Sequence, residues 1–142
     1  MWFECKVRYE KPSEGDATRR VAEAYLVDAL SFTEAEARIT EEMEPYCSGG
    51  EFVVSDIKRA KYAELFHSER DADDRWYKLK LTFITLDEKK GEEKRTSQSV
   101  LVQASDLRRA IDLLDEGMKG SMADYEISAV SETAIMDVFL FK

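Results

Sequence analysis

The sequence predicts an α+β protein in which two ββαβ repeats, related by a pseudo-twofold axis, form one domain over residues 1–142. Three blocks of the first half, which begin at positions 2, 25 and 51, recur at 76, 100 and 124, displacements of 74, 75 and 73 residues. Such repetition indicates repeated structural units. Because a half of about 70 residues is marginally stable alone, we expect the halves to share one core, with two helices covering an antiparallel sheet.

Each repeat begins with two strands that form a hairpin. Residues 2–9 and 76–83 carry an apolar side chain at every second position, which is typical of a half-buried strand. These apolar faces are Phe3, Cys5, Val7 and Tyr9 in one copy, and Tyr77, Leu79, Leu81 and Phe83 in the other. Polar turns at 12–16 and 87–92 lead into the second strands, so we expect hairpin loops of several residues.

A helix follows each hairpin. Its apolar residues recur at spacings of three, four and four, which places them on one helical stripe. The two stripes are Phe32, Ala35, Ile39 and Met43, and Leu107, Ala110, Leu114 and Met118. Ser31 with Glu34 matches a capping box, and Asp106 is an equally good N-cap residue.

An extended segment completes each repeat and continues to Phe66 or Phe139. In the first copy the apolar phase changes between Val54 and Ile57, so we expect a β-bulge or a bend in the middle of the segment. The repeats are therefore assigned to residues 1–67 and 75–142, with a polar junction at 68–74.

Several stretches have amino-acid sequences similar to those of one known family. They are WFECKVRYE at 2–10, YLVDALSFTEAEARI at 25–39 and MADYEIS at 122–128. These stretches resemble the domain-of-unknown-function family numbered 4494, which occurs in bacteria and some of their phages, and the similarity runs from Trp2 to about Phe139. The resemblance implies a small intracellular domain, and it transfers no activity, cofactor or catalytic residue to this chain.

Composition excludes several classes of protein. The chain is 44% hydrophobic, with only 6 Gly and 2 Pro, which argues against a disordered or collagen-like chain. It has no apolar run near the roughly 20 residues that cross a bilayer, and its N-terminus is charged too early for a signal peptide. We therefore expect a cytoplasmic protein without a membrane partner. The net charge, 21 − 30 = −9, argues against a chain-wide DNA-binding surface.

We predict that the protein is not an enzyme and uses no cofactor or metal. The chain has one histidine, His67, and two cysteines. Cys5 lies on a predicted core face, and Cys47 follows a helix C-terminus, where the negative end of the dipole disfavours a thiolate. The acidic run Asp71, Asp73 and Asp74 lacks the glycine and glutamate of a calcium loop, so we expect it to be solvated.

The leading functional prediction is a non-catalytic protein-binding or adaptor domain. Residues 33–44 carry five acidic groups and one arginine, a net charge of −4, which favours a basic partner protein. The candidate partner-binding residues are Glu34, Glu41, Glu42 and Glu44. The alternative interpretation is that this acidic helix face is exposed to solvent and binds no partner. Unpaired edges of the long strands could also accept a partner strand or make a homodimer.

The alternative is a single-stranded nucleic-acid-binding protein that uses the outer faces of the hairpins. Aromatic rings stack on bases, and neighbouring cations hold phosphates. The candidate residues for this alternative are Trp2, Lys6, Arg8, Trp76, Lys78 and Lys80. The acidic groups of the second turn offset much of this charge, since residues 76–95 carry six basic and four acidic groups.

Overall fold

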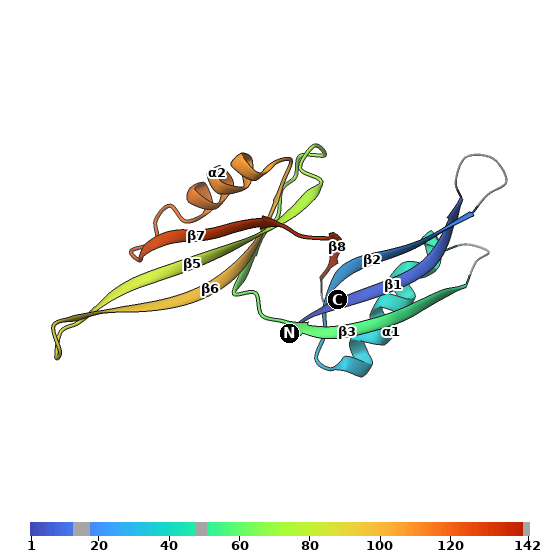
Figure 1. Ribbon diagram of the computed structural model, residues 1–142, viewed down its shortest axis with the longest axis horizontal. Helices are drawn as coiled ribbons and strands as arrows, with labels where there is room; N and C mark the ends of the chain where they lie inside the picture. Colours follow the sequence, from blue (N-terminus) through green and yellow to red (C-terminus); the bar gives the residue numbers. More distant parts are fainter. Residues whose placement is uncertain (13–17, 48–50, 141–142) are drawn as a thin grey trace. The chain divides into compact units, whose positions relative to one another are not determined.

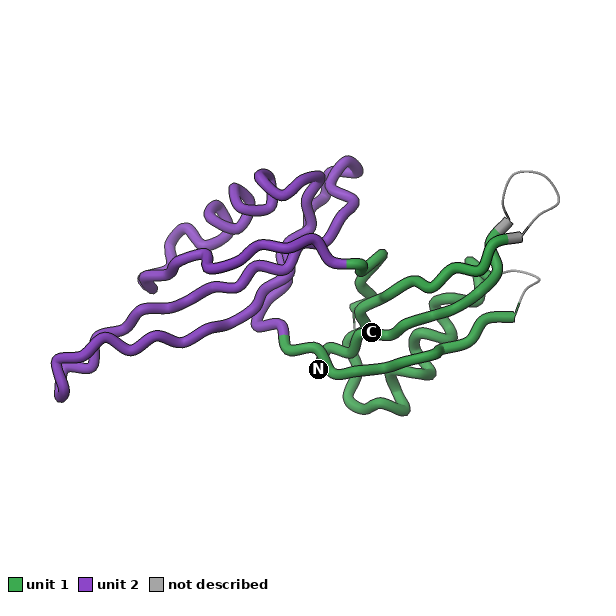
Figure 2. The backbone as a smooth tube through the Cα atoms, in the orientation of Figure 1, with its two compact units in different colours: residues 1–61, 134–142 green, residues 62–133 purple. Residues whose placement is uncertain are grey.

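The computed structural model describes residues 1–12, 18–47 and 51–140 and has an α+β fold with two four-stranded sheets and two α-helices (Figure 1). The chain divides into two compact units. Unit 1 comprises Met1–Lys61 and Ala134–Lys142, and unit 2 comprises Tyr62–Thr133 (Figure 2). None of the described helices is long and apolar enough to cross a membrane.

Unit 1 has a sheet of order β3-β1-β2-β8 with helix α1 on one face. Its elements are β1 (Trp2–Pro12), β2 (Thr18–Asp28), α1 (Phe32–Met43), the short 3-10 helix η1 (Glu44–Tyr46), β3 (Phe52–Ala60) and β8 (Ile135–Phe139). β1 pairs antiparallel with β2 and β3, whereas β8 pairs parallel with β2. The predicted apolar face is confirmed, because Phe3, Cys5 and Val7 are buried with Ile39 and Met43.

Unit 2 has a sheet of order β4-β6-β5-β7 with helix α2 on one face. Its elements are β4 (Glu64–Phe66), β5 (Arg75–Asp87), β6 (Glu92–Ala104), α2 (Leu107–Gly117) and β7 (Asp124–Glu132). β5 pairs antiparallel with β6 and β7, whereas β4 pairs parallel with β6. Leu79 and Leu81 of β5 pack with Leu114 of α2 in a buried cluster, as their sequence pattern predicted.

Local signals predicted both helix starts. The Ser31 hydroxyl accepts from the Glu34 N–H at 3.1 Å, and the Asp106 carboxylate accepts from the Arg109 N–H at 2.7 Å. The prediction that the first residue of each apolar stripe belongs to the core was wrong, because Phe32 is 51% exposed and Leu107 is 47% exposed. Each of these residues occupies the first helical turn, beside its cap, where the helix begins at the surface.

The expected bulge is confirmed, and the same irregularity occurs in both sheets. The register of β1 with β3 shifts between Lys6 and Val7, so Ser55 has no pairing partner on β1. The register of β5 with β7 shifts between Lys80 and Leu81, which leaves Ser128 without a partner on β5. The second hairpin also has the predicted loop of several residues, whereas residues 13–17 of the first loop lie outside the described residues.

The segments that end at Phe66 and Phe139 each serve both sheets. After β3 the chain leaves the sheet of unit 1, and β4 joins the sheet of unit 2; after β7, β8 joins the sheet of unit 1. The units therefore differ from the predicted repeats 1–67 and 75–142, because each sheet takes its last strand from the other repeat. Each unit has its own cluster of buried apolar residues between its sheet and its helix.

Candidate partner-binding surfaces

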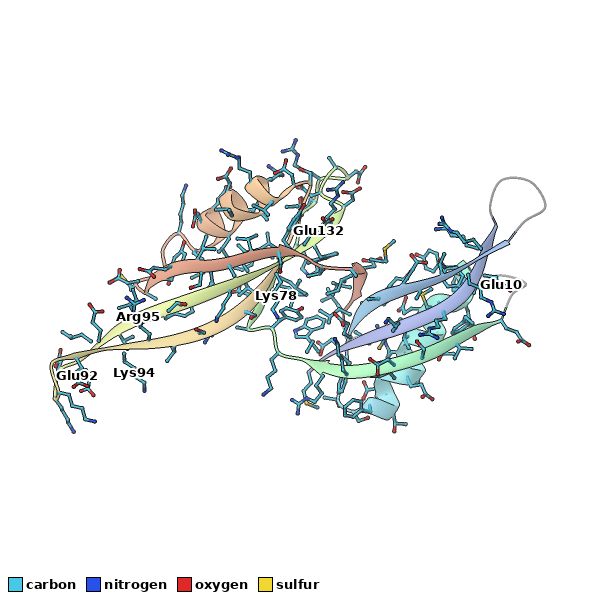
Figure 3. The ribbon with its side chains drawn as sticks, viewed as in Figure 1. Glu10, Lys78, Glu92, Lys94, Arg95 and Glu132 are labelled. Carbon is cyan, nitrogen blue, oxygen red and sulfur yellow. The ribbon has the colours of Figure 1, made fainter. Side chains whose placement is uncertain are left out.

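Unit 2 has an open strand edge along the outer half of β6. β6 pairs with β5 from Glu92 to Ala104 without a register shift, but β4 covers only Val100–Val102 on its other side. Residues 92–98 are all exposed, and no described strand pairs with their outer side. Figure 1 shows the β5–β6 hairpin extending past the end of β7, and Figure 3 shows Glu92, Lys94 and Arg95 along this part of β6.

The direction of the β6 backbone follows from one hydrogen bond. The Ala63 N–H donates to the Ser99 carbonyl at 2.8 Å, so the backbone groups of Ser99 point towards the β4 side. Successive residues of a strand paired to one neighbour alternate in direction. Arg95 and Ser97 therefore direct their N–H and C=O groups to the open edge, whereas those of Thr96 point to β5. Open N–H and C=O groups of this kind are a template for another strand.

The acidic helix presents less negative charge than the sequence predicted. Glu41 and Glu44 are exposed, but Glu34 and Glu42 are only partly so. Glu42 lies 3.5 Å from the Arg38 guanidinium, which also donates to the Leu140 carbonyl at 2.8 Å. Both charges are thus partly satisfied inside unit 1, and the fully exposed carboxylates of residues 33–44 are those of Glu36, Glu41 and Glu44.

Only some of the residues that were predicted to bind nucleic acid are exposed in the structure. Lys6, Arg8, Lys78 and Lys80 are exposed, as expected. Trp76, however, is only 2% exposed, and His67 packs edge-on against its ring with the centroids 5.3 Å apart. Trp2 is half-buried. The prediction that Trp76 offers a stacking surface was therefore wrong, because the ring is buried.

Lys78 and Lys80 remain as a basic pair on the sheet face of unit 2 opposite α2. Their cross-strand neighbours are uncharged: Leu101 and Ser131 beside Lys78, and Ser99 and Ala129 beside Lys80. Within the described part of the chain, no carboxylate forms an ion pair with either lysine. Lys6, in contrast, lies opposite Asp56 of β3 in unit 1.

The predicted junction 68–74 is an ordered part of unit 2 that is fixed by a buried aspartate. Asp73 is 2% exposed, and its carboxylate accepts from Arg109 Nε at 2.6 Å and Nη2 at 2.9 Å. The Ser68 hydroxyl also donates to Asp73, and the Ser68 N–H donates to Gln103 Oε1 at 2.9 Å. The expectation of a solvated acidic run therefore holds for Asp71 and Asp74, which are exposed, and fails for Asp73.

The Arg109 guanidinium and the Ser68 hydroxyl hold the pKa of Asp73 well below its usual range, even though burial acts in the opposite direction. Both oxygens of the carboxylate bind one guanidinium, which is the strongest geometry for such a pair. The sequence did not predict this network, because Asp73 and Arg109 are 36 residues apart in the chain.

Neither thiol is in a setting that favours a nucleophile. Cys5 is fully buried, and burial raises the pKa of its thiol to about 12. Burial and the nearby Glu23 carboxylate also raise the pKa of the Cys47 thiol. Glu23 accepts a hydrogen bond from Tyr9, whose pKa is raised to about 12 by burial and by that bond. Among residues 1–12, 18–47 and 51–140, no group of three or more His, Cys, Asp or Glu side chains could hold a metal ion.

The geometry defines an α+β protein with two helix-covered sheets, an open strand edge and one basic sheet face. The family described as domain of unknown function DUF4494 matches residues 1–141, nearly the whole chain. The chain therefore belongs to this family, as the resemblance of its sequence predicted. No match to the chain is found among the curated proteins or among the solved structures.

Proposed function

We propose that this protein is a non-catalytic, cytoplasmic binding domain whose protein partner adds an extended segment to the open edge of β6. The observation that carries the proposal is the edge itself. A segment from elsewhere in the chain, β4, already adds to the inner end of this edge in parallel, and Glu92–Gln98 continue it without a partner among the described strands. An extended peptide that joins such an edge gains main-chain hydrogen bonds.

Two features support β6 over β3 and β7. β3 and β7 each carry a bulge, at Ser55 and Ser128, and bulges on edge strands oppose the pairing of further strands. β6 is regular throughout its pairing with β5. Its open part contains the charged sequence Glu92, Glu93, Lys94 and Arg95, which disfavours indiscriminate association and favours a partner of matching charge pattern.

We also infer that the two halves of the chain arose by duplication of one ββαβ element. The support is the order strand, strand, helix, strand in each half, and the bulge that follows Lys6 in one sheet and Lys80 in the other, 74 positions apart. The exchange of β4 and β8 between the sheets is consistent with two halves that have folded together since the duplication.

Replacing Ser97 by proline tests the proposed function. The substitution removes an N–H that points to the open edge and spares the bonds to β5, a position where strands tolerate proline. We expect a nuclease-treated extract of native cells to yield one partner protein on the wild-type bait, with retention reduced about tenfold or more on Ser97→Pro, which corresponds to about 1.4 kcal/mol.

Ser97→Ala is the matched control, because it leaves the backbone intact and should retain the partner as well as the wild type does. Equal retention by Ser97→Pro, at an unchanged thermal midpoint, would contradict strand addition at this edge. If the retained protein proves to be a second copy of the chain, the edge makes a homodimer, and light scattering of the purified protein would show twice the monomer mass.

A second candidate function is binding of single-stranded nucleic acid by the face that carries Lys78 and Lys80. Exposed cations among small and hydroxyl-bearing neighbours favour contact with phosphates, whereas the burial of Trp76 removes the predicted stacking partner. Binding of a labelled oligothymidylate that Lys78→Glu with Lys80→Glu abolishes, and that Ser97→Pro leaves unchanged, would favour this second candidate over the first.

A further inference from the structure

Unit 2 contains a pocket of about 510 Å³ that the proposed edge does not use. It is lined by β4 and the residues that follow it, by the end of β6, and by the C-terminal half of α2. Its apolar lining includes Phe66, Val102 and Leu113. The volume is within the range of about 300–1,000 Å³ that is typical of binding pockets in proteins.

Gly117 shapes one wall of this pocket. A Cβ atom at Gly117 would lie 2.6 Å from Cε1 of Phe66, so only glycine lets the aromatic ring approach the helix so closely. The ring of Phe66 is thereby held beside α2 and provides a flat apolar surface on which an alkyl chain can pack.

The polar lining of the pocket is acidic. Glu69 and Glu116 are both exposed and both line it, and His67 is the one other titratable side chain in the lining. The pocket also includes the C-terminal end of α2, which carries the negative end of the helix dipole. The two carboxylates and this helix end attract a cation and repel an anion.

Part of the pocket wall is fixed by hydrogen bonds within unit 2. The Ser68 N–H is bonded to Gln103 at 2.9 Å, and the Ser68 hydroxyl is bonded to the buried Asp73 carboxylate. Arg109 forms its ion pair with that same carboxylate and none with Glu116 among the described residues. A site ordered in this way requires little rearrangement on binding.

We propose that this pocket receives a lysine or arginine side chain of the protein partner, with its alkyl part against Phe66 and Leu113 and its cation beside Glu69 and Glu116. The inference rests on the proposed function, because it assigns the partner a basic residue next to the segment that binds. An alkyl stem with a charged end matches a pocket that is apolar in its interior and acidic at its polar positions. The acidic recognition that the sequence predicted for α1 is thereby assigned to unit 2.

Blocked tripeptides test this assignment, with the imidazole signal of His67 in the proton NMR spectrum as the readout. The chain has one histidine, so the signal needs no further assignment. Acetyl-Gly-Lys-Gly-amide and its arginine counterpart should shift the signal saturably. The same peptide with norleucine should bind at least about fivefold more weakly, because it lacks the cation, and the glutamate peptide should produce no saturable shift.

Glu116→Lys should weaken binding of the lysine peptide at least about fivefold, whereas the matched control Asp112→Lys should not. Asp112 is exposed on the same helix but does not line the pocket. Equal binding of the lysine and glutamate peptides, or equal loss in the two variants, would overturn the assignment. A tripeptide is too short to occupy the edge of β6, so Ser97→Pro should not change its binding. The tripeptide assay therefore tests the pocket alone, and the capture assay with Ser97→Pro tests the edge alone.

Discussion

Replacing Arg109 by methionine is expected to destabilise unit 2 by about 3–5 kcal/mol, because it leaves the Asp73 carboxylate buried without its charged partner. Amide hydrogen exchange of Leu79 and Val102, which are buried in the core of unit 2, would measure the loss. Arg108→Met is the matched control, since Arg108 is the exposed neighbour of Arg109 on α2 and forms no ion pair among the described residues. A loss no larger than that of the control would show that the pair does not stabilise the unit.

The same pair predicts a dependence of stability on pH. Since Arg109 holds the pKa of Asp73 below its usual value of about 4, the ionised carboxylate stabilises the folded state above that pH. This contribution should disappear as the pH falls below about 4 towards the folded-state pKa. In Arg109→Met the carboxylate has lost its largest stabilising contact, so acid unfolding over this range should be less steep than in the wild type.

A chain that ends at Thr133 lacks β8 and should lose about 3–6 kcal/mol of stability in unit 1. Ile135 is 4% exposed, and the ring of Phe139 stacks on Tyr25 with the centroids 5.7 Å apart. Burial of each such side chain contributes about 1.5–3 kcal/mol. The truncation also uncovers the edge of β2 from Ala24 to Val27, so we expect self-association as well.

Amide exchange would separate the expected effect of this truncation from a general loss of stability. The amides of β2 should exchange much faster in the truncated chain, while those of β5 should change little, because β5 belongs to unit 2. Met136→Ala is the control in the full chain, since Met136 is 53% exposed on the same strand. Unchanged exchange in β2 would contradict a structural role for β8.

The features that the sequence predicted are those with local causes. Alternation revealed the apolar faces around Cys5 and Leu79, the cap residues Ser31 and Asp106 marked the helix starts, and the phase change before Ile57 revealed the bulge. Each of these signals depends on side chains a few positions apart, whose geometry is set by the periods of helices and strands.

The features that the sequence did not predict depend on partners far along the chain. β8 has the pattern of a strand, but nothing in residues 135–139 identifies β2 as its neighbour. Asp73 sits in a run of like residues, and only the fold brings Arg109 to it. Trp76 alternates like an outward side chain, yet it is buried, so the candidate nucleic-acid surface lacks this aromatic ring.

Hydrogen exchange at the edge of β6 tests the proposed function most directly. In the free protein the amides of Arg95 and Ser97 should exchange fast, because they point to the open edge, whereas that of Thr96 should be protected by its bond to β5. Addition of the captured partner should protect Arg95 and Ser97 and leave Thr96 unchanged. Fast exchange of both edge amides in the saturated complex would contradict strand addition at β6.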